Sequence, residues 1–229
     1  MKSLESRIDE TIDWIQRTTD VASGRGALIP VSGGSDSALC FWLCAKALPP
    51  GRAVAAYVGS GLRCREWFEQ QGPVRFIPEP AADGHPEAQR WAIMLSLSLN
   101  VRSWLVGTRN RSEDVFGTYS LASRVATYLP LAGFWKSEVM ALAELVGVPA
   151  EILDSSQRAD PSCGRPEEMA AIPFETVDQF LQVRVGERPE SDLSGVPLST
   201  IEYLESVYRR NQFKMQLPLR GLDASTKNR

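Results

Sequence analysis

The chain has 229 residues, of which 43% are hydrophobic and 23% are charged, a globular composition that excludes a disordered protein. The formal net charge of −3 gives no basic surface for nucleic acid, and no apolar stretch reaches the roughly 20 residues that span a bilayer. We therefore expect one domain, residues 1–229, with a full hydrophobic core and with no nucleic-acid or membrane partner.

The first residues, MKSLESRIDETIDWI, have the spacing of an acidic amphipathic helix and not that of a signal peptide. The four cysteines show no paired framework, and Cys40 and Cys44 are four residues apart in an apolar helical pattern. This usage favours reduced thiols in a cytoplasmic protein. His85 is the single histidine of the chain, which excludes a metal site built from several histidines.

Helix and strand patterns alternate along the chain. The expected helices cover 3–18, 37–48, 86–100, 136–146, 174–185 and 200–212, and the expected strands cover 27–31, 53–58, 74–77 and 103–106. The alternation predicts an α/β fold, a doubly wound parallel sheet of Rossmann-like type with helices on both faces. Ligands of such sheets bind beyond the carboxyl ends of the strands. Ser32-Gly33-Gly34 and Gly107-Thr108 both lie at such ends.

The stretch that follows the first expected strand has the composition of an anion site. It reads SGGSDS and comprises Ser32, Gly33, Gly34, Ser35, Asp36 and Ser37. The two glycines let backbone amides approach a ligand, and the helix that begins near Ser35 adds partial positive charge. The hydroxyls of Ser32 and Ser37 can donate to phosphate oxygens. Asp36 fits this setting if a divalent cation lies between it and the phosphates, or if it only caps the helix of an empty turn.

The stretch is neither a Walker A loop, because the lysine after the last glycine is missing, nor a G-x-G-x-x-G motif. The pattern S-G-G-x-D-S after a strand resembles the signature of the N-type ATP pyrophosphatases, the PP-loop enzymes. Further segments are similar, in order and spacing, to those of ammonia-dependent NAD synthetases. They are VGTRNRSEDVFG (106–117), FWKSEVMALAELVGVPAEIL (134–153), RADPSCGRPEE (158–168), IPFETVDQFL (172–181) and FKMQLP (213–218).

This resemblance implies an adenine nucleotide alpha hydrolase-like fold and an amide-forming ligase. Such an enzyme uses Mg-ATP to adenylate a carboxylate, releases pyrophosphate, and lets ammonia displace AMP. The resemblance assigns Asp36 and Glu113 to Mg²⁺, and Asp36 and Lys136 to catalysis. It assigns nucleotide binding to Ser32, Gly33, Gly34, Ser35, Asp36, Ser37, Thr108, Lys136 and Arg158. Arg158 stands where the family has a threonine.

The departures from the family pattern lie on the side of the acid substrate. The stretch GTYSLASRVATYLP (117–130) lacks the acids with which the family holds nicotinate, and contains Arg124 instead. Gln89 replaces the arginine of the central helix, with Arg90 beside it, and Phe213 replaces the histidine before Lys214. Gln89, Arg90, Arg124 and Lys214 are therefore the candidate substrate residues, and the acid is either deamido-NAD or a different carboxylate.

Partners follow from the same resemblance. The chain shows no glutaminase motif, so the ammonia is free or is delivered by a separate protein, and a homodimer is expected, with the helix 86–100 as a candidate interface. Two other functions stay open. One is sulfur transfer through Cys163, as in some PP-loop enzymes, and the other is a nucleotide-binding subunit without catalysis.

Overall fold

The computed structural model describes residues 3–21, 25–80, 84–159 and 166–217. The strands are β1 (Gly26–Pro30), β2 (Ala53–Val58), β3 (Val74–Ile77) and β4 (Ser103–Leu105). The α-helices are α1 (Leu4–Val21), α2 (Ser35–Ala47), α3 (Arg65–Gln71), α4 (Pro86–Asn100), α5 (Arg111–Phe116), α6 (Lys136–Leu145), α7 (Ala150–Gln157), α8 (Glu167–Ala170), α9 (Phe174–Arg184) and α10 (Leu198–Asn211). Short 3-10 segments are η1 (Leu121–Val125), η3 (Glu190–Gly195) and η4 (Gln212–Gln216).

The four strands form one parallel sheet in the order β3-β2-β1-β4. The chain moves outward from β1 through β2 to β3, then returns through α4 to β4 on the other side of β1. The strand order therefore reverses between β1 and β4, the place where ligands of doubly wound sheets bind. Beyond β4, Val106 makes an isolated parallel bridge with Tyr128, which extends this edge of the sheet.

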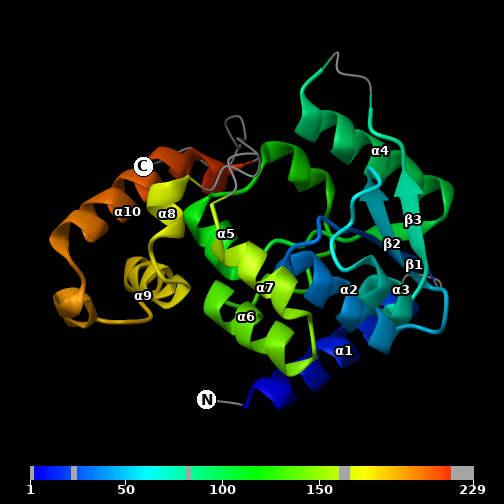
Figure 1. The fold of residues 1–229 in the computed structure, drawn as a ribbon. Helices are drawn as coiled ribbons and strands as arrows, with labels where there is room; N and C mark the ends of the chain where they lie inside the picture. Colours follow the sequence, from blue (N-terminus) through cyan, green and yellow to red (C-terminus); the bar gives the residue numbers. More distant parts are fainter. Residues whose placement is uncertain (1–2, 22–24, 81–83, 160–165, 218–229) are drawn as a thin grey trace, which may run out of the picture.

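Alternate residues of β1 enter two different cores. Ala27 and Ile29 lie with the buried residues of α2, whereas Leu28 lies with Met94 of α4 on the opposite face of the sheet. This alternation is the consequence of the two-residue repeat of a strand. Helices thus cover both faces, as Figure 1 shows, and the predicted fold class is confirmed.

A third apolar cluster lies away from the sheet, among α5, α9 and α10. Phe180, Leu181 and Leu204 are fully buried in it. Figure 1 shows α8, α9 and α10 on the side of the molecule opposite the sheet, with α5, α6 and α7 between. Whether residues 1–229 form one domain stays a prediction.

The sequence analysis located the long helices to within a few residues but missed α3, α5, α7 and α8. These helices have four to eight residues, too few turns for a helical repeat to stand out from the sequence. Among the described residues, no helix combines the length and the apolar character that crossing a membrane requires.

Gly26 is predicted to be essential for the pairing of β1 with β2. A Cβ atom at this position would lie 2.5 Å from the carbonyl oxygen of Arg52, a backbone atom that cannot move without breaking the ladder. We expect Gly26→Ala to lower the free energy of unfolding by about 1–3 kcal/mol in urea titrations. Gly133→Ala is the matched control, because nothing lies within 4 Å of its Cβ. Equal stability of the two variants would contradict this packing argument.

Candidate active site

The loop after β1 is held in its shape by its own serines and by α7. Gly33 has a φ of 79°, in the left-handed region that favours glycine. The Ser37 hydroxyl donates to the Gly34 carbonyl at 3.0 Å, and the Ser35 amide donates to Ser156 Oγ of α7 at 3.0 Å. Gly34 is the N-cap of α2 and no side chain caps this end. Asp36 therefore does not serve as a helix cap, and the carboxylate is left for other contacts.

Asp36 is the meeting point of three chain segments. Lys136 Nζ forms an ion pair with its Oδ2 and also donates to Ser35 Oγ at 2.9 Å. Asn110 Nδ2, from the segment after β4, donates to Asp36 Oδ1 at 2.7 Å. The Lys136 side chain is 12% exposed and that of Asp36 is 22% exposed. The switch point between β1 and β4 thus holds a partly buried carboxylate with a lysine on one oxygen and an amide on the other.

Glu113 stands beside this pair in the first turn of α5. Its amide donates to Asn110 Oδ1 at 3.0 Å, and Glu113 Oε2 accepts from the Asn110 amide at 3.2 Å, which together form a capping box. Burial and the negative charge of Asp36 raise the pKa of Glu113 to about 7, while Lys136 and Arg109 lower it. Carboxylate oxygens such as those of Asp36 and Glu113 are the donors that a hard cation such as Mg²⁺ prefers. The residues present fit this ion.

A buried carboxylate in α9 fixes the helices that carry these groups. Asp178 is 2% exposed and accepts hydrogen bonds from the Ser137 amide at 2.7 Å and from the Ser112 hydroxyl. Ser112 Oγ in turn accepts from the Lys136 amide at 2.7 Å. Asp178 therefore binds the N-terminus of α6 and the start of α5 at once, and positions Lys136 relative to Glu113.

Sequence reasoning did not assign roles to Asn110, Asp178 or Ser156. The sequence does contain a pattern that marks Asp178, because this acid falls among the apolar residues Val177 and Leu181 on the buried face of α9. Asn110 had a weaker one, the N-x-x-E pattern of a capping box. Ser156 had none, because its contact with Ser35 joins residues 121 positions apart.

The remaining nucleotide candidates lie around the same end of the sheet. Thr108 follows β4 and precedes Arg109, whose Nε is 2.8 Å from Asp114 Oδ1. Arg158 is the exposed C-cap residue of α7, two positions after Ser156.

The substrate candidates Gln89 and Arg90 lie near the N-terminus of α4, where Arg90 Nη2 is 2.9 Å from Glu87 Oε1. Cys163 lies outside the described residues.

Arg124 and Lys214 lie together, and both hold backbone carbonyls. Arg124 donates to the carbonyls of Lys214 and Leu217 at 3.1 and 2.8 Å. Lys214 Nζ donates to the carbonyls of Gly117 and Tyr119 at 2.7 and 2.8 Å, and burial lowers its pKa. These bonds join the end of the described chain to the loop after α5. Their roles toward a substrate stay predictions, as do those of Gln89 and Arg90.

Comparison with known proteins decides the family. The family model of NAD synthase matches residues 81–218, more than half of the chain. The chain belongs to the NAD synthase family. A similar relative is the NH(3)-dependent NAD(+) synthetase of Methanocaldococcus jannaschii, which is 26% identical over an alignment that covers 95% of this chain and 96% of the relative. The resemblance inferred from the sequence is therefore confirmed.

Solved structures show the same fold. An NMN synthetase from Francisella tularensis superposes with a TM-score of 0.78 at 20% identity, covering 97% of this chain and all of that chain. The NH3-dependent NAD synthetase from Campylobacter jejuni superposes with a TM-score of 0.75 at 19% identity and the same coverage. As a member of the NAD synthase family, the protein is an ATP-dependent ligase that forms an amide from ammonia and a carboxylate.

Asp178→Asn is predicted to weaken both the fold and the site. The amide cannot accept from both Ser112 and Ser137 as the carboxylate does, and the loss of a charged acceptor costs about 1.5–3 kcal/mol of unfolding free energy. Because Lys136 is then less firmly placed, kcat/KM should fall by about 10- to 100-fold. Glu175→Gln, an exposed acid of the same helix α9, should leave both quantities unchanged. An active Asp178→Asn enzyme with normal kinetics would contradict the positioning role.

The raised pKa of Glu113 predicts a pH-dependent stability of the metal-free protein. Between the ordinary value of 4.5 and about 7, the folded chain binds a proton that the unfolded chain has lost, so stability falls as pH rises through this window. Relative to Glu113→Gln, the wild type should lose up to about 3 kcal/mol of unfolding free energy between pH 4.5 and 8, measured in urea with a chelator present. Parallel pH profiles of the two proteins would show that Glu113 titrates normally.

Proposed function

We propose that the protein amidates the nicotinate carboxylate of deamido-NAD at the site around Asp36. The observation that carries this proposal is the convergence of Asp36, Lys136 and Glu113 beside the Ser32–Ser37 loop, in a chain of the NAD synthase family. The curated relatives named NH(3)-dependent NAD(+) synthetase support the choice of acid and of ammonia. We further infer a cytoplasmic enzyme that takes free ammonia or receives it from a separate protein.

The loop and the start of α2 bind the phosphates of ATP in this proposal. The amides near Gly33 and Gly34, the hydroxyl of Ser32 and the N-terminal end of α2 present partial positive charge to them. Thr108 and Arg158 contact the rest of the nucleotide. Asp36 and Glu113 would hold Mg²⁺, which would supply positive charge to the phosphate oxygens and lower the repulsion that an incoming carboxylate meets.

In this proposal Lys136 contacts Asp36 first and the phosphates of ATP afterwards. In the structure its ammonium group lies on Asp36 and Ser35. If Asp36 held a metal ion, the ammonium would be free to reach the phosphates. It would then stabilise the charge that builds up on pyrophosphate as the substrate carboxylate oxygen attacks the α-phosphorus and the bond from the α-phosphorus to the pyrophosphate oxygen breaks. Ammonia then attacks the acyl carbon, AMP leaves with the bonding electrons, and the nitrogen loses a proton.

The acid subsite is where this chain departs from its relatives, so a second acid is included in the proposal. The segment Gly117–Pro130 has no carboxylate, and Arg124 and Lys214 lie beside Tyr119. Such a subsite is more cationic than that of the family pattern and favours a more anionic or smaller acid. The structural neighbour is named NMN synthetase, so the mononucleotide acid, the counterpart of NMN with a carboxylate in place of the amide, is a suitable test substrate.

We also propose that two chains associate through α4. Leu99 of this helix is 62% exposed, and Trp91 and Leu95 are only half-buried. Apolar side chains at this spacing on a surface helix are typical of a subunit contact. Gel filtration of the purified protein, with Leu99→Glu as a variant, tests this proposal.

The test of the proposed reaction is release of pyrophosphate and AMP from Mg-ATP and ammonia, with deamido-NAD and the mononucleotide acid as alternatives. We expect release that depends on the acid, and a loss of at least about 100-fold in kcat/KM in Asp36→Asn, because the metal and Lys136 both depend on this carboxylate. Asp154→Asn, an exposed acid of α7, is the matched control and should keep full activity.

Other outcomes separate the remaining functions. ATP binding without pyrophosphate release from any acid would favour a non-catalytic nucleotide-binding subunit. Adenylation that leads to sulfur transfer, and that is lost in Cys163→Ser, would favour the sulfur transferase. An amide-forming ligase should be indifferent to Cys163→Ser.

A further inference from the structure

Arginines gather at the amino end of the sheet, the end opposite the candidate active site. Arg25, Arg52 and Arg102 are the residues directly before β1, β2 and β4. The register pairs Gly26 with Ser103 and Ala27 with Ala53, so the three arginines start neighbouring strands at nearly the same level. Because adjacent strands are about 4.8 Å apart, their backbones lie within roughly 10 Å.

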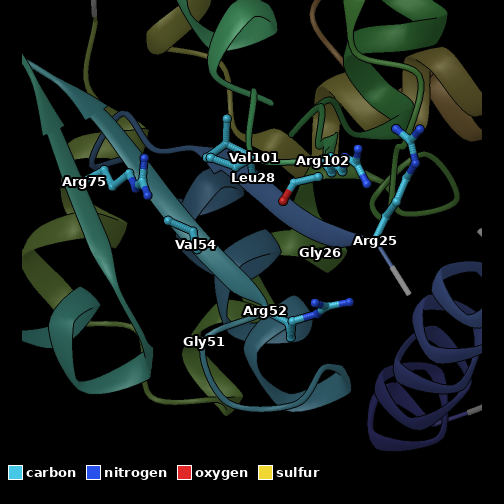
Figure 2. A pocket seen from close by; sticks show the side chains of 10 residues that line it. Arg25, Gly26, Leu28, Gly51, Arg52, Val54, Arg75, Val101 and Arg102 are labelled. Atoms are coloured by element: carbon cyan, nitrogen blue, oxygen red, sulfur yellow. The ribbon is translucent and has the colours of Figure 1, made fainter. Parts of the chain in front are cut away.

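A fourth arginine reaches the same place from the edge strand. Arg75 of β3 pairs with Ala56, which packs in the core that contains Met94 of α4. Since paired residues of parallel strands point to the same side, Arg75 projects on the α4 face of the sheet. The four arginines line one cavity of about 830 Å³, together with the apolar side chains of Leu28 and Val54. In Figure 2 Arg75 lies to the left of Val54 and Arg102 to the right of Leu28, whereas the Arg25 side chain points away from both apolar residues.

The guanidinium groups of the four arginines have no carboxylate partner among the described residues. That of Arg25 lies over the Trp104 ring, 5.7 Å from its centroid, and Trp104 packs in the core on the α2 face of the sheet. Within the described ranges, none of the four makes an ion pair, and all four residues are exposed. Elsewhere arginines such as Arg65, Arg184 and Arg209 pair with carboxylates. The chain as a whole carries a net charge of −3, so four arginines that form no ion pair with a described residue are a local excess of positive charge at this edge.

Helix dipoles account for only part of this concentration. α2 and α4 end at this edge of the sheet, and a positive side chain near a helix C-terminus is favourable. The dipole effect is screened by salt, acts within the last turn, and leaves the planar N–H forks of the arginines open. It does not explain why Arg75, which lies within a strand, faces the same cavity.

We propose that this cavity is a second anion site, which binds a nucleoside diphosphate or a closely similar phosphorylated small molecule. Guanidinium groups bind phosphate oxygens in bidentate fashion, and several around one cavity fit a ligand with more than one phosphate. Val54, which is half-buried, is the apolar floor of the cavity, whereas Leu28 is fully buried; this floor fits a ligand with an organic body. The volume lies in the range of about 300–1,000 Å³ that is usual for small-molecule sites.

The site is separate from the candidate active site. β1 has five residues and joins the two, so the arginines and the Ser32–Ser37 loop are about 17 Å apart along this strand. Binding at the arginine cavity therefore requires neither the acid substrate nor turnover, and the proposal stands independently of which carboxylate is amidated.

The test is titration calorimetry with ADP on the full chain, with a chelator present so that metal-dependent binding at Asp36 is suppressed. We expect binding to the wild type that weakens as salt rises, and at least about tenfold weaker binding to Arg52→Ala/Arg75→Ala. The matched control is Arg188→Ala/Arg209→Ala, which removes two exposed arginines from elsewhere and should bind as the wild type does. The KM for ATP in the amidation assay should be the same in all three proteins.

The competing outcomes are distinct. Undiminished ADP binding by the Arg52→Ala/Arg75→Ala protein, or no binding by the wild type under these conditions, would overturn the proposal. Inorganic pyrophosphate bound as tightly as ADP would overturn the role of the apolar floor and of the nucleoside. If the alanine pair lowers the thermal unfolding midpoint, Arg52→Gln/Arg75→Gln keeps the side-chain length and gives the same comparison in a folded protein.

Discussion

The carboxylate of Asp178 is the contact on which the geometry of the candidate site depends. It lies in α9, and its hydrogen bonds reach the Ser137 amide at the start of α6 and the Ser112 hydroxyl in α5. These two short helices carry Lys136 and Glu113. Phe180 and Leu181 of α9 are buried in one cluster with Leu204 of α10, so the packing of the helical part of the molecule stabilises the positions of Lys136 and Glu113. The hydrogen bonds of Asp178 are structural, and their effect is to position Lys136 and Glu113 relative to each other.

The switch point between β1 and β4 carries both positive and negative side chains. Lys136 and Asn110 neutralise and bind Asp36, while burial and the nearby Asp36 raise the pKa of Glu113. Glu113 is therefore the carboxyl group of the pair that takes up a proton readily. In the proposed reaction Asp36 and Glu113 would instead hold a metal ion, with Lys136 released from Asp36.

The parallel sheet also gives the molecule two chemically different ends. All strands point the same way, so residues that follow strands meet at one edge and residues that precede strands meet at the other. Glycines, hydroxyls and carboxylates occupy the first edge, and the row of Arg25, Arg52 and Arg102 occupies the second. The proposed second anion site thus arises from the same topology as the candidate active site.

Local patterns in the sequence determined the fold class and marked a candidate phosphate-binding loop. The glycine pair after the apolar strand and the alternation of strands and helices were predicted, because strand and helix repeats and turn residues act within a few positions of the chain. Asp36 was singled out by the composition of the loop, whereas Glu113 and Lys136 were singled out only by the resemblance to NAD synthetases. The roles of those three residues in catalysis stay predictions. Asn110, Asp178 and Ser156 emerged only from the tertiary structure, in contacts that span 74, 41 and 121 positions. The gathering of the arginines likewise needed the strand order and register. A sequence carries the chemistry of each side chain and the repeat of its own element, but the pairing of distant elements is set by which faces are buried together, and that is decided by packing of the whole chain.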